Sequence, residues 1–185
     1  MKNQLSYAKP LIIIVIIFVS GSLYAVTKSP LPEVVKLDWP KLEMVGQTSL
    51  KRYGLHIYDA SYWMLEGKAS DFFSTNTHAL SITYARKISS DRLLSSTKKE
   101  WIRLGFAEQY PIDAWLKILE HLWPDVTKGD QLIAVSSPDG KTTFYDNKEP
   151  IGTIEDANFG TVFFAIWLDE NSRFKKNREE LLGEE

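Results

Sequence analysis

The hydrophobic pattern changes its period near Ser89, and this change constrains the fold more than any other feature of the chain. From Ala79 to Ile88, apolar and polar residues alternate, as they do in a strand with one covered face. From Ser90 to Gly105, apolar residues recur every three or four positions, which predicts a helix capped by Ser89 or Ser90 and ended by Gly105. Strand followed by helix in one chain indicates an α+β domain.

The rest of the chain predicts the same fold class. The predicted elements are two strands within residues 42–64 that meet or bend near Gly54, a helix from Pro111 to Pro124, a hairpin over residues 131–146, a strand over residues 150–154, a helix from Phe159 to Trp167 and a short surface helix after Arg173. This order predicts an open-faced β-sandwich, in which helices cover one face of a large antiparallel sheet.

The first 25 residues have the layout of an export signal. Lys2 and Lys9 precede an unbroken apolar run from Leu11 to Val19, and small residues follow up to Ala25. Two alternatives stay open: a signal peptide cleaved after Ala25, or an uncleaved anchor in the inner membrane over residues 7–26. Either way the rest of the chain is expected outside the cytoplasm, in the periplasm.

The remaining residues suit one domain. Residues 26–41 contain Pro30, Pro32 and Pro40 and few periodic apolar positions, so we predict an extended linker there. The folded domain is predicted to span residues 42–183.

Composition excludes several classes of function. The 22 Lys and Arg residues are interspersed with 24 Asp and Glu residues, which gives no basic face and argues against nucleic acid as a partner. The chain has no cysteine, and His56, His78 and His121 have no metal-ligand spacing. No phosphate-binding loop or hydrolase motif is present, so neither a metal nor a cofactor is expected. Nothing in the sequence indicates an oligomeric state.

Four separated stretches resemble the bacterial chalcone isomerase-like family. They are Val45-Gly46-Gln47-Thr48 with Ile57-Tyr58-Asp59-Ala60, Leu80 to Ile88 with Tyr84 and Arg86, Trp123-Pro124-Asp125-Val126 with Lys128-Gly129-Asp130, and Phe159 to Leu168 with Arg178, Leu181, Leu182 and Gly183. The resemblance covers residues 42–183 and implies the same open-faced β-sandwich. It also implies either ring closure of a flavanone precursor beside an arginine, or fatty-acid binding by an arginine and a tyrosine.

The sequence departs from this family at the arginine. Its expected position falls near Gly46, and the nearest basic residues, Lys51 and Arg52, are displaced from it. We therefore assign no catalytic residue, since a fold alone does not supply one.

The candidate ligand-binding residues are Tyr84, Arg86, Arg52 and Tyr58. Tyr84 and Arg86 stand two apart on a predicted strand, so both side chains would leave the same face and could grip a carboxylate. The alternative is that Arg86 only pairs with Asp91 or Glu100 on the surface.

These observations predict a non-catalytic exported domain that binds a small amphipathic molecule such as a fatty acid. Two alternatives remain: an intramolecular lyase of the chalcone isomerase type, and a pocketless interaction protein of the cell envelope. A cavity between sheet and helices distinguishes the three.

Overall fold

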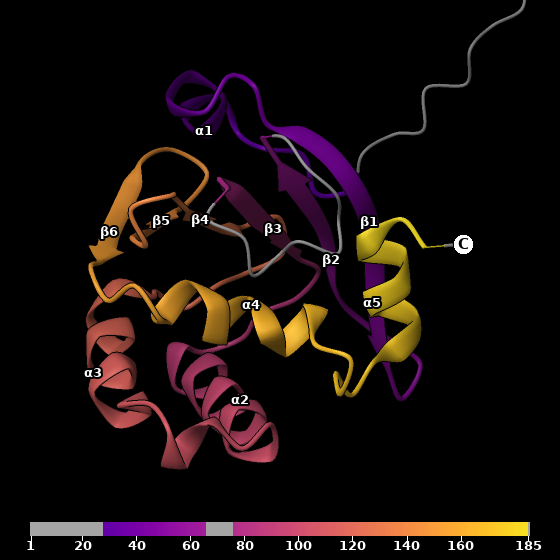
Figure 1. Cartoon of the computed structure of the whole chain (residues 1–185). Coiled ribbons are helices and arrows are strands. Elements are labelled where there is room, and N and C mark those ends of the chain that lie inside the picture. The colour runs from indigo at the N-terminus through magenta and orange to yellow at the C-terminus, as the bar shows by residue number, and fades with distance from the viewer. Residues whose placement is uncertain (1–27, 66–75, 185) are drawn as a thin grey trace, which may run out of the picture.

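One six-stranded antiparallel sheet forms the centre of the molecule, with its strands in chain order from β1 to β6 (Figure 1). The computed structural model describes residues 28–65 and 76–184. The strands are β1 (Glu43–Arg52), β2 (Leu55–Met64), β3 (His78–Tyr84), β4 (Gln131–Ser136), β5 (Thr142–Tyr145) and β6 (Pro150–Ile154). Each strand pairs with the next, so the predicted antiparallel sheet is confirmed.

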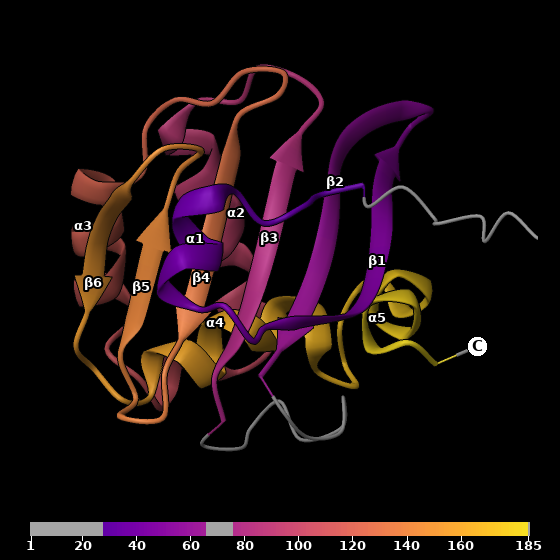
Figure 2. The same cartoon turned by 90° about the horizontal axis from the view of Figure 1, so that it is seen from above.

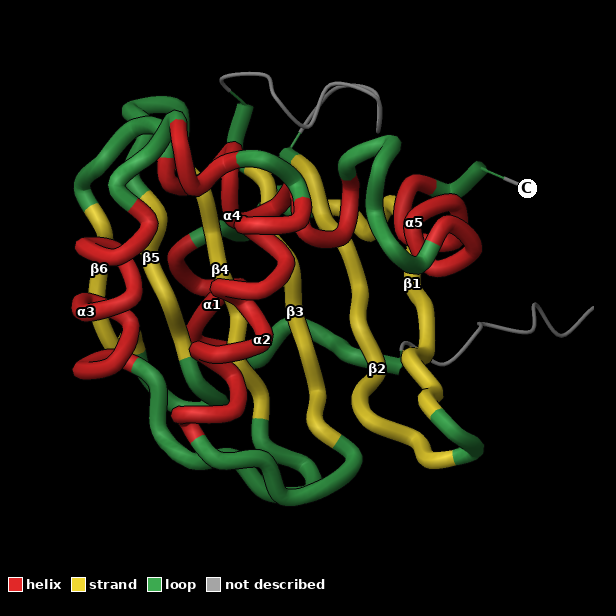
Figure 3. The backbone as a smooth tube through the Cα atoms, turned by 90° about the horizontal axis from the view of Figure 1, so that it is seen from below, coloured by secondary structure: helices red, strands yellow, loops and turns green. Residues whose placement is uncertain are grey.

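Most helices cover one face of this sheet. They are α2 (Ser90–Arg103), the 3₁₀ helix η2 (Phe106–Glu108), α3 (Ile112–Leu122), α4 (Phe159–Leu168) and α5 (Lys175–Leu182). Figure 3 shows α2, α3 and α4 in front of the sheet and α5 beside β1. This arrangement confirms the predicted α+β sandwich. No helix within the described residues is long and apolar enough to cross a membrane.

Aromatic side chains fill the space between sheet and helices. Trp115 on α3 lies 5.4 Å from Phe159 on α4, and Phe163 on α4 lies 5.3 Å from Phe144 on β5, as measured between ring centroids. All four side chains are at most 3% exposed. Edge-to-face contacts of this kind stabilise a core beyond the area they bury. The layer is therefore closely packed at its centre.

The N-terminal segment differs from the predicted linker. Residues 33–38 form helix α1 (Glu33–Asp38), which lies on the sheet face opposite α2, α3 and α4 (Figures 1 and 2). Leu31 and Val35 are four residues apart, and both are buried with Ile133 of β4. Pro32 stands just before the first helical residue, where its missing N–H costs no hydrogen bond.

Polar contacts also fix this segment to the sheet. The Ser29 hydroxyl forms hydrogen bonds with the hydroxyls of Ser81 and Thr83 on β3, at 3.0 and 2.8 Å. The side-chain amide of Gln131 on β4 donates to the carbonyl oxygen of Pro30 at 2.8 Å. We call residues 28–39 the strap. The strap covers part of the sheet face opposite α2, α3 and α4, whereas the sequence predicted helices on one face only.

Two motifs from opposite ends of the chain meet at β1. A Cβ atom at Gly46 would overlap the backbone carbonyl oxygens of Glu180 and Leu181 on α5. Gly183, which ends α5 with a φ of 67°, lies against the carbonyl oxygen of Val45. The glycine at position 46 thus lets a helix backbone approach the strand directly.

Candidate functional site

The candidate site is a pair of tyrosines under the helical layer. Tyr58 on β2 and Tyr84 on β3 are direct partners in the sheet register, and their rings meet edge to face with centroids 6.4 Å apart. Tyr84 is buried and Tyr58 is partly buried. Both lie near the end of the sheet where β2 begins and β3 ends. The structure therefore brings together two of the four predicted site residues.

Helix α4 holds one of the two phenols. The indole N–H of Trp167 donates to the Tyr58 hydroxyl oxygen at 2.9 Å. Burial raises the pKa of Tyr58 to about 12, the Trp167 hydrogen bond opposes this shift, and the charge of Glu100 adds to it. Burial, helped by the neighbouring Tyr58, likewise raises the pKa of Tyr84. Both groups stay neutral at neutral pH and can donate a proton in a hydrogen bond.

Charged residues flank the pair on the α2 side. Glu100 accepts from Arg103 Nε at 2.6 Å and lies 3.0 Å from Arg173 NH2. Arg103 also donates to the carbonyl oxygen of Asn171 at 2.7 Å, which ties α2 to the segment after α4. One carboxylate thus faces two guanidinium groups, so the flank carries a net positive charge.

The other two predicted residues lie outside this group. The strand β3 ends at Tyr84: the Ala85 N–H still bonds to the Ile57 carbonyl oxygen of β2, but the chain bends at Ala85 and Arg86 and leaves the sheet. Arg86 follows that turn and is exposed, so it does not share a strand face with Tyr84. Arg52 is exposed at the tip of the β1–β2 hairpin, where its guanidinium lies 5.3 Å from the Tyr53 ring.

The alternative prediction for Arg86 was a surface ion pair with Asp91 or Glu100, and the described residues do not form it. Glu100 pairs with Arg103 and Arg173 rather than with Arg86. Among the described residues, Arg86 makes no ion pair.

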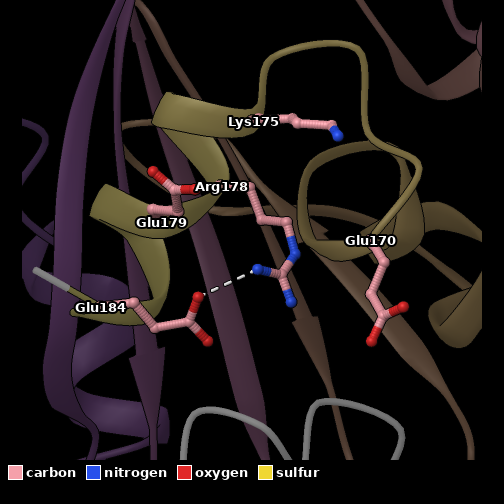
Figure 4. A pocket seen from close by; sticks show the side chains of 5 residues that line it. All are labelled: Glu170, Lys175, Arg178, Glu179 and Glu184. Carbon is pink, nitrogen blue, oxygen red and sulfur yellow. Dashed lines mark hydrogen bonds and ion pairs between the residues drawn. The ribbon is translucent and has the colours of Figure 1, made fainter.

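Two hollows formed by described residues lie elsewhere, and both are open and largely charged. One, of about 340 Å³, surrounds Arg178 on α5, which donates to the carbonyl oxygen of Leu168 and pairs with Glu184 (Figure 4). The other, of about 560 Å³, lies between α2 and α3 around Leu94 and Leu116. Within residues 28–65 and 76–184, no cluster of His, Asp and Glu side chains is placed to hold a metal ion.

The sequence did not predict the charged residues on the α2 side of the tyrosine pair, nor the contact of Trp167 with Tyr58. Glu100 and Arg103 are three apart on α2, a spacing that brings helical side chains together and that could have revealed the pair. Arg173 is 73 positions from Glu100, and Trp167 is 109 positions from Tyr58, so no local pattern links either to the site.

The fold and the tyrosine pair define an α+β domain with neutral hydrogen-bond donors at one end of its helix–sheet interface. Residues 24–183 match the family model described as chalcone isomerase-like. The chain belongs to this family, so the resemblance noted in the sequence is confirmed.

The chain is also similar to two individual proteins. Over 70 residues, the chain is 36% identical to an uncharacterised protein of Haemophilus influenzae, a match that covers 38% of this chain and 34% of the relative. The chain thus matches about a third of that relative's length. The crystal structure of a fatty-acid binding protein of Arabidopsis thaliana superposes with a TM-score of 0.61, covering 77% of this chain and 87% of the other. At 11% identity, the second likeness shows the fold alone.

Proposed function

We propose that this domain binds an amphipathic carboxylic acid without chemical conversion, with the acid head at the phenols of Tyr58 and Tyr84. The observation that carries the proposal is the pair itself: two neutral phenols held side by side under an apolar helical layer. Phenol O–H groups donate to a carboxylate, and the surrounding aromatic residues suit an acyl chain. The fatty-acid binding protein of similar fold supports the choice of ligand.

Catalysis is not part of this proposal. Ring closure of the chalcone isomerase type needs a cation placed to stabilise an oxyanion. Among the described residues, neither Tyr58 nor Tyr84 hydrogen-bonds to an arginine or lysine, and the charged group that raises the pKa of Tyr58 is the Glu100 carboxylate.

The test is calorimetric titration of the wild type and of Tyr84→Phe with one long-chain fatty acid. A hydrogen bond to a charged group contributes about 1.5–3 kcal/mol, so the variant should bind about tenfold or more weakly. Tyr84→Phe suits this purpose because its hydroxyl makes no hydrogen bond within the described residues.

Arg86→Ala is the matched comparison. A loss similar to that of Tyr84→Phe would restore Arg86 as a head-group ligand, as the sequence suggested. If Arg86→Ala binds the fatty acid as tightly as the wild type, the phenols of Tyr58 and Tyr84 hold the head group without Arg86. Equal affinity of wild type and Tyr84→Phe contradicts the proposed site.

One observation favours a second candidate, a pocketless interaction domain. The centre of the helix–sheet layer is filled by Trp115, Phe144, Phe159 and Phe163, so an acyl chain must displace side chains to enter. Absence of fatty-acid binding by either protein would select this second function.

We also propose that the domain acts outside the cytoplasm of a bacterium, in the periplasm. The support is the order of charge and apolar residues up to Ala25, which lies next to the start of the family match at residue 24. Fractionation tests this proposal, and the chain should separate with periplasmic or membrane material. Recovery of the full-length chain as soluble cytoplasmic protein contradicts it.

A further inference from the structure

The tip of the β1–β2 hairpin has an unusual composition for a tight turn. Its two central residues, Tyr53 and Gly54, both have positive φ, at 52° and 74°. Turns of this shape favour Asn-Gly, and among the described residues Tyr53 is the only one other than glycine with positive φ. The tyrosine is thus kept at a position where it costs stability, which points to a role outside the fold.

The tip also exposes apolar side chains. Tyr53 is 90% exposed and Leu55 is 52% exposed, on either side of Gly54 at the end of the hairpin. The guanidinium of Arg52 lies over the Tyr53 ring at 5.3 Å. An apolar tip beside cations is suited to a surface that offers both negative charge and an apolar layer.

The antiparallel topology gathers further cations at the same end of the sheet. The arrowheads of β1, β3 and β5 point to this end (Figure 2), so the chain segments after these strands lie there together. Six exposed basic residues lie at this end, on the last two residues of β1, after β3, before β4 and after β5, and we call them the basic rim: Lys51, Arg52, Arg86, Lys87, Lys128 and Lys148. None of the six makes an ion pair with a described residue.

Acidic residues at this end are mostly bound to backbone groups. Asp125 accepts from the Ser90 N–H, Asp130 from the Thr127 N–H, and Asp146 from the N–H groups of Lys148 and Glu149. A backbone hydrogen bond leaves the charge of a carboxylate in place, so Asp125, Asp130, Asp146 and Glu149 offset four of the six cations, and Asp91 and Arg92 on α2 cancel each other. Six cations against four carboxylates leave an excess of two positive charges, although the whole chain has a formal charge of −2.

We propose that the basic rim, with Tyr53 and Leu55, binds the surface of a bilayer that contains anionic phospholipid. The six strands span about 24 Å at a spacing of about 4.8 Å, so the cations can contact several headgroups at once. Tyr53 and Leu55 insert at the boundary between headgroups and acyl chains. A phosphate backbone would use the cations but not the aliphatic Leu55 side chain, which favours lipid over nucleic acid. The proposal is independent of any ligand at Tyr58 and Tyr84.

Because the chain contains no cysteine, a single introduced cysteine can be labelled with one fluorescent probe at a chosen position. A nitrobenzoxadiazole label on Leu55→Cys reports the tip, and the same label on Pro138→Cys reports the opposite end, in the exposed turn between β4 and β5. The full-length chain is mixed with phosphatidylcholine vesicles with or without phosphatidylglycerol. This comparison reads out the contact surface even if the N-terminal segment itself holds the chain to vesicles.

We expect the emission of the label at position 55 to shift to the blue with anionic vesicles and to return at high salt. The label at position 138 should not respond. Each cation near an anionic surface changes affinity by about fivefold, so Lys51→Gln with Arg52→Gln should raise the half-saturating lipid concentration about 25-fold. Lys99→Gln with Lys117→Gln, exposed on α2 and α3, removes the same charge and should change it less than about twofold.

Equal shifts at positions 55 and 138, or equal shifts with both vesicle types, would overturn the proposal. A response of the label at 55 to duplex DNA but not to vesicles would assign the rim to nucleic acid instead. A shift that depends only on protein concentration, without vesicles, would assign it to contact with a second copy of the chain.

Discussion

Two residues reduce the stability of the domain: Tyr53 through its backbone conformation, and His78 through its burial. Tyr53 has a backbone conformation that suits glycine or asparagine, and it is almost fully exposed. His78 is 3% exposed and packs on Phe164 with ring centroids 4.4 Å apart. Its Nδ1 bonds to the Asn76 carbonyl oxygen, while its Nε2 has no hydrogen-bond partner among the described residues. Each residue permits a test at a single position.

Tyr53→Asn should stabilise the domain. The left-handed conformation costs most side chains about 1–2 kcal/mol, which asparagine largely avoids. Loss of the Arg52 contact with the ring offsets about 0.5–1 kcal/mol of the gain. The net gain of about 0.5–1 kcal/mol should raise Tm by about 2 °C in a thermal melt. Arg52→Asn, which keeps Tyr53, should lower stability slightly. A variant Tyr53→Asn that melts below the wild type contradicts this account.

His78 should make the domain less stable in acid. Burial lowers its pKa below the value of 6.5 that it has in the unfolded chain. Below pH 6.5, the unfolded chain therefore binds more protons than the folded one, so stability present above that pH is lost as the pH falls through the folded pKa. Urea unfolding from pH 7.5 down to pH 5 should show this loss as a fall in the free energy of unfolding.

His78→Phe should flatten the pH dependence in this window. The exposed His121→Phe is the control and should leave the wild-type slope in place. An unchanged slope in His78→Phe would show that other groups cause the acid sensitivity.

At the scale of elements, α5 and β1 illustrate how separated motifs act together. The residues Val45-Gly46 and Leu181-Leu182-Gly183 are more than 130 positions apart, yet the helix backbone rests on the glycine of the strand. A register irregularity between Met44 and Gly46 accompanies this close approach. The C-terminal helix therefore closes the edge of the sheet at β1, and its position depends on the absence of one side chain.

Gly46→Ala should destabilise the domain by about 2 kcal/mol or more. The new Cβ atom overlaps backbone oxygens of Glu180 and Leu181, which cannot rotate aside as a flexible side chain would. Chemical denaturation measures the change. Lys51→Ala, exposed on the same strand, should change stability by less than about 0.5 kcal/mol. A Gly46→Ala variant as stable as this control contradicts the close contact of α5.

Local periodicity was enough to predict most elements but only part of the site. The strand at Pro150–Ile154 and the helix at Phe159–Leu168 follow their patterns closely, since their apolar faces meet the core. In the sequence, Arg86 continues the alternation of β3, but the last backbone bond to β2 is that of Ala85 to Ile57, and the chain bends at Ala85 and Arg86. Where a strand stops depends on its neighbour in space, which a single segment does not encode.

At the scale of the whole molecule, the topology collects residues that the sequence scatters. The six cations of the basic rim come from four separate parts of the chain, so the sequence shows interspersed charge and no basic face. The sheet places all four parts at one end. The strap is a second case. Its prolines indicate a linker, whereas its apolar residues pack against residues of the distant strands β3, β4 and β5.

Leu31→Ala tests whether the strap belongs to the folded core. Leu31 is 2% exposed and packs in a cluster with Ala79 and Ile133, so its truncation should cost about 2–5 kcal/mol. Leu37→Ala is the matched control, because this leucine lies on the same segment but is 72% exposed. It should change stability by less than about 0.5 kcal/mol. Urea unfolding of both variants measures the difference. If the two are equally stable, the segment before β1 behaves as the free linker that its prolines indicate.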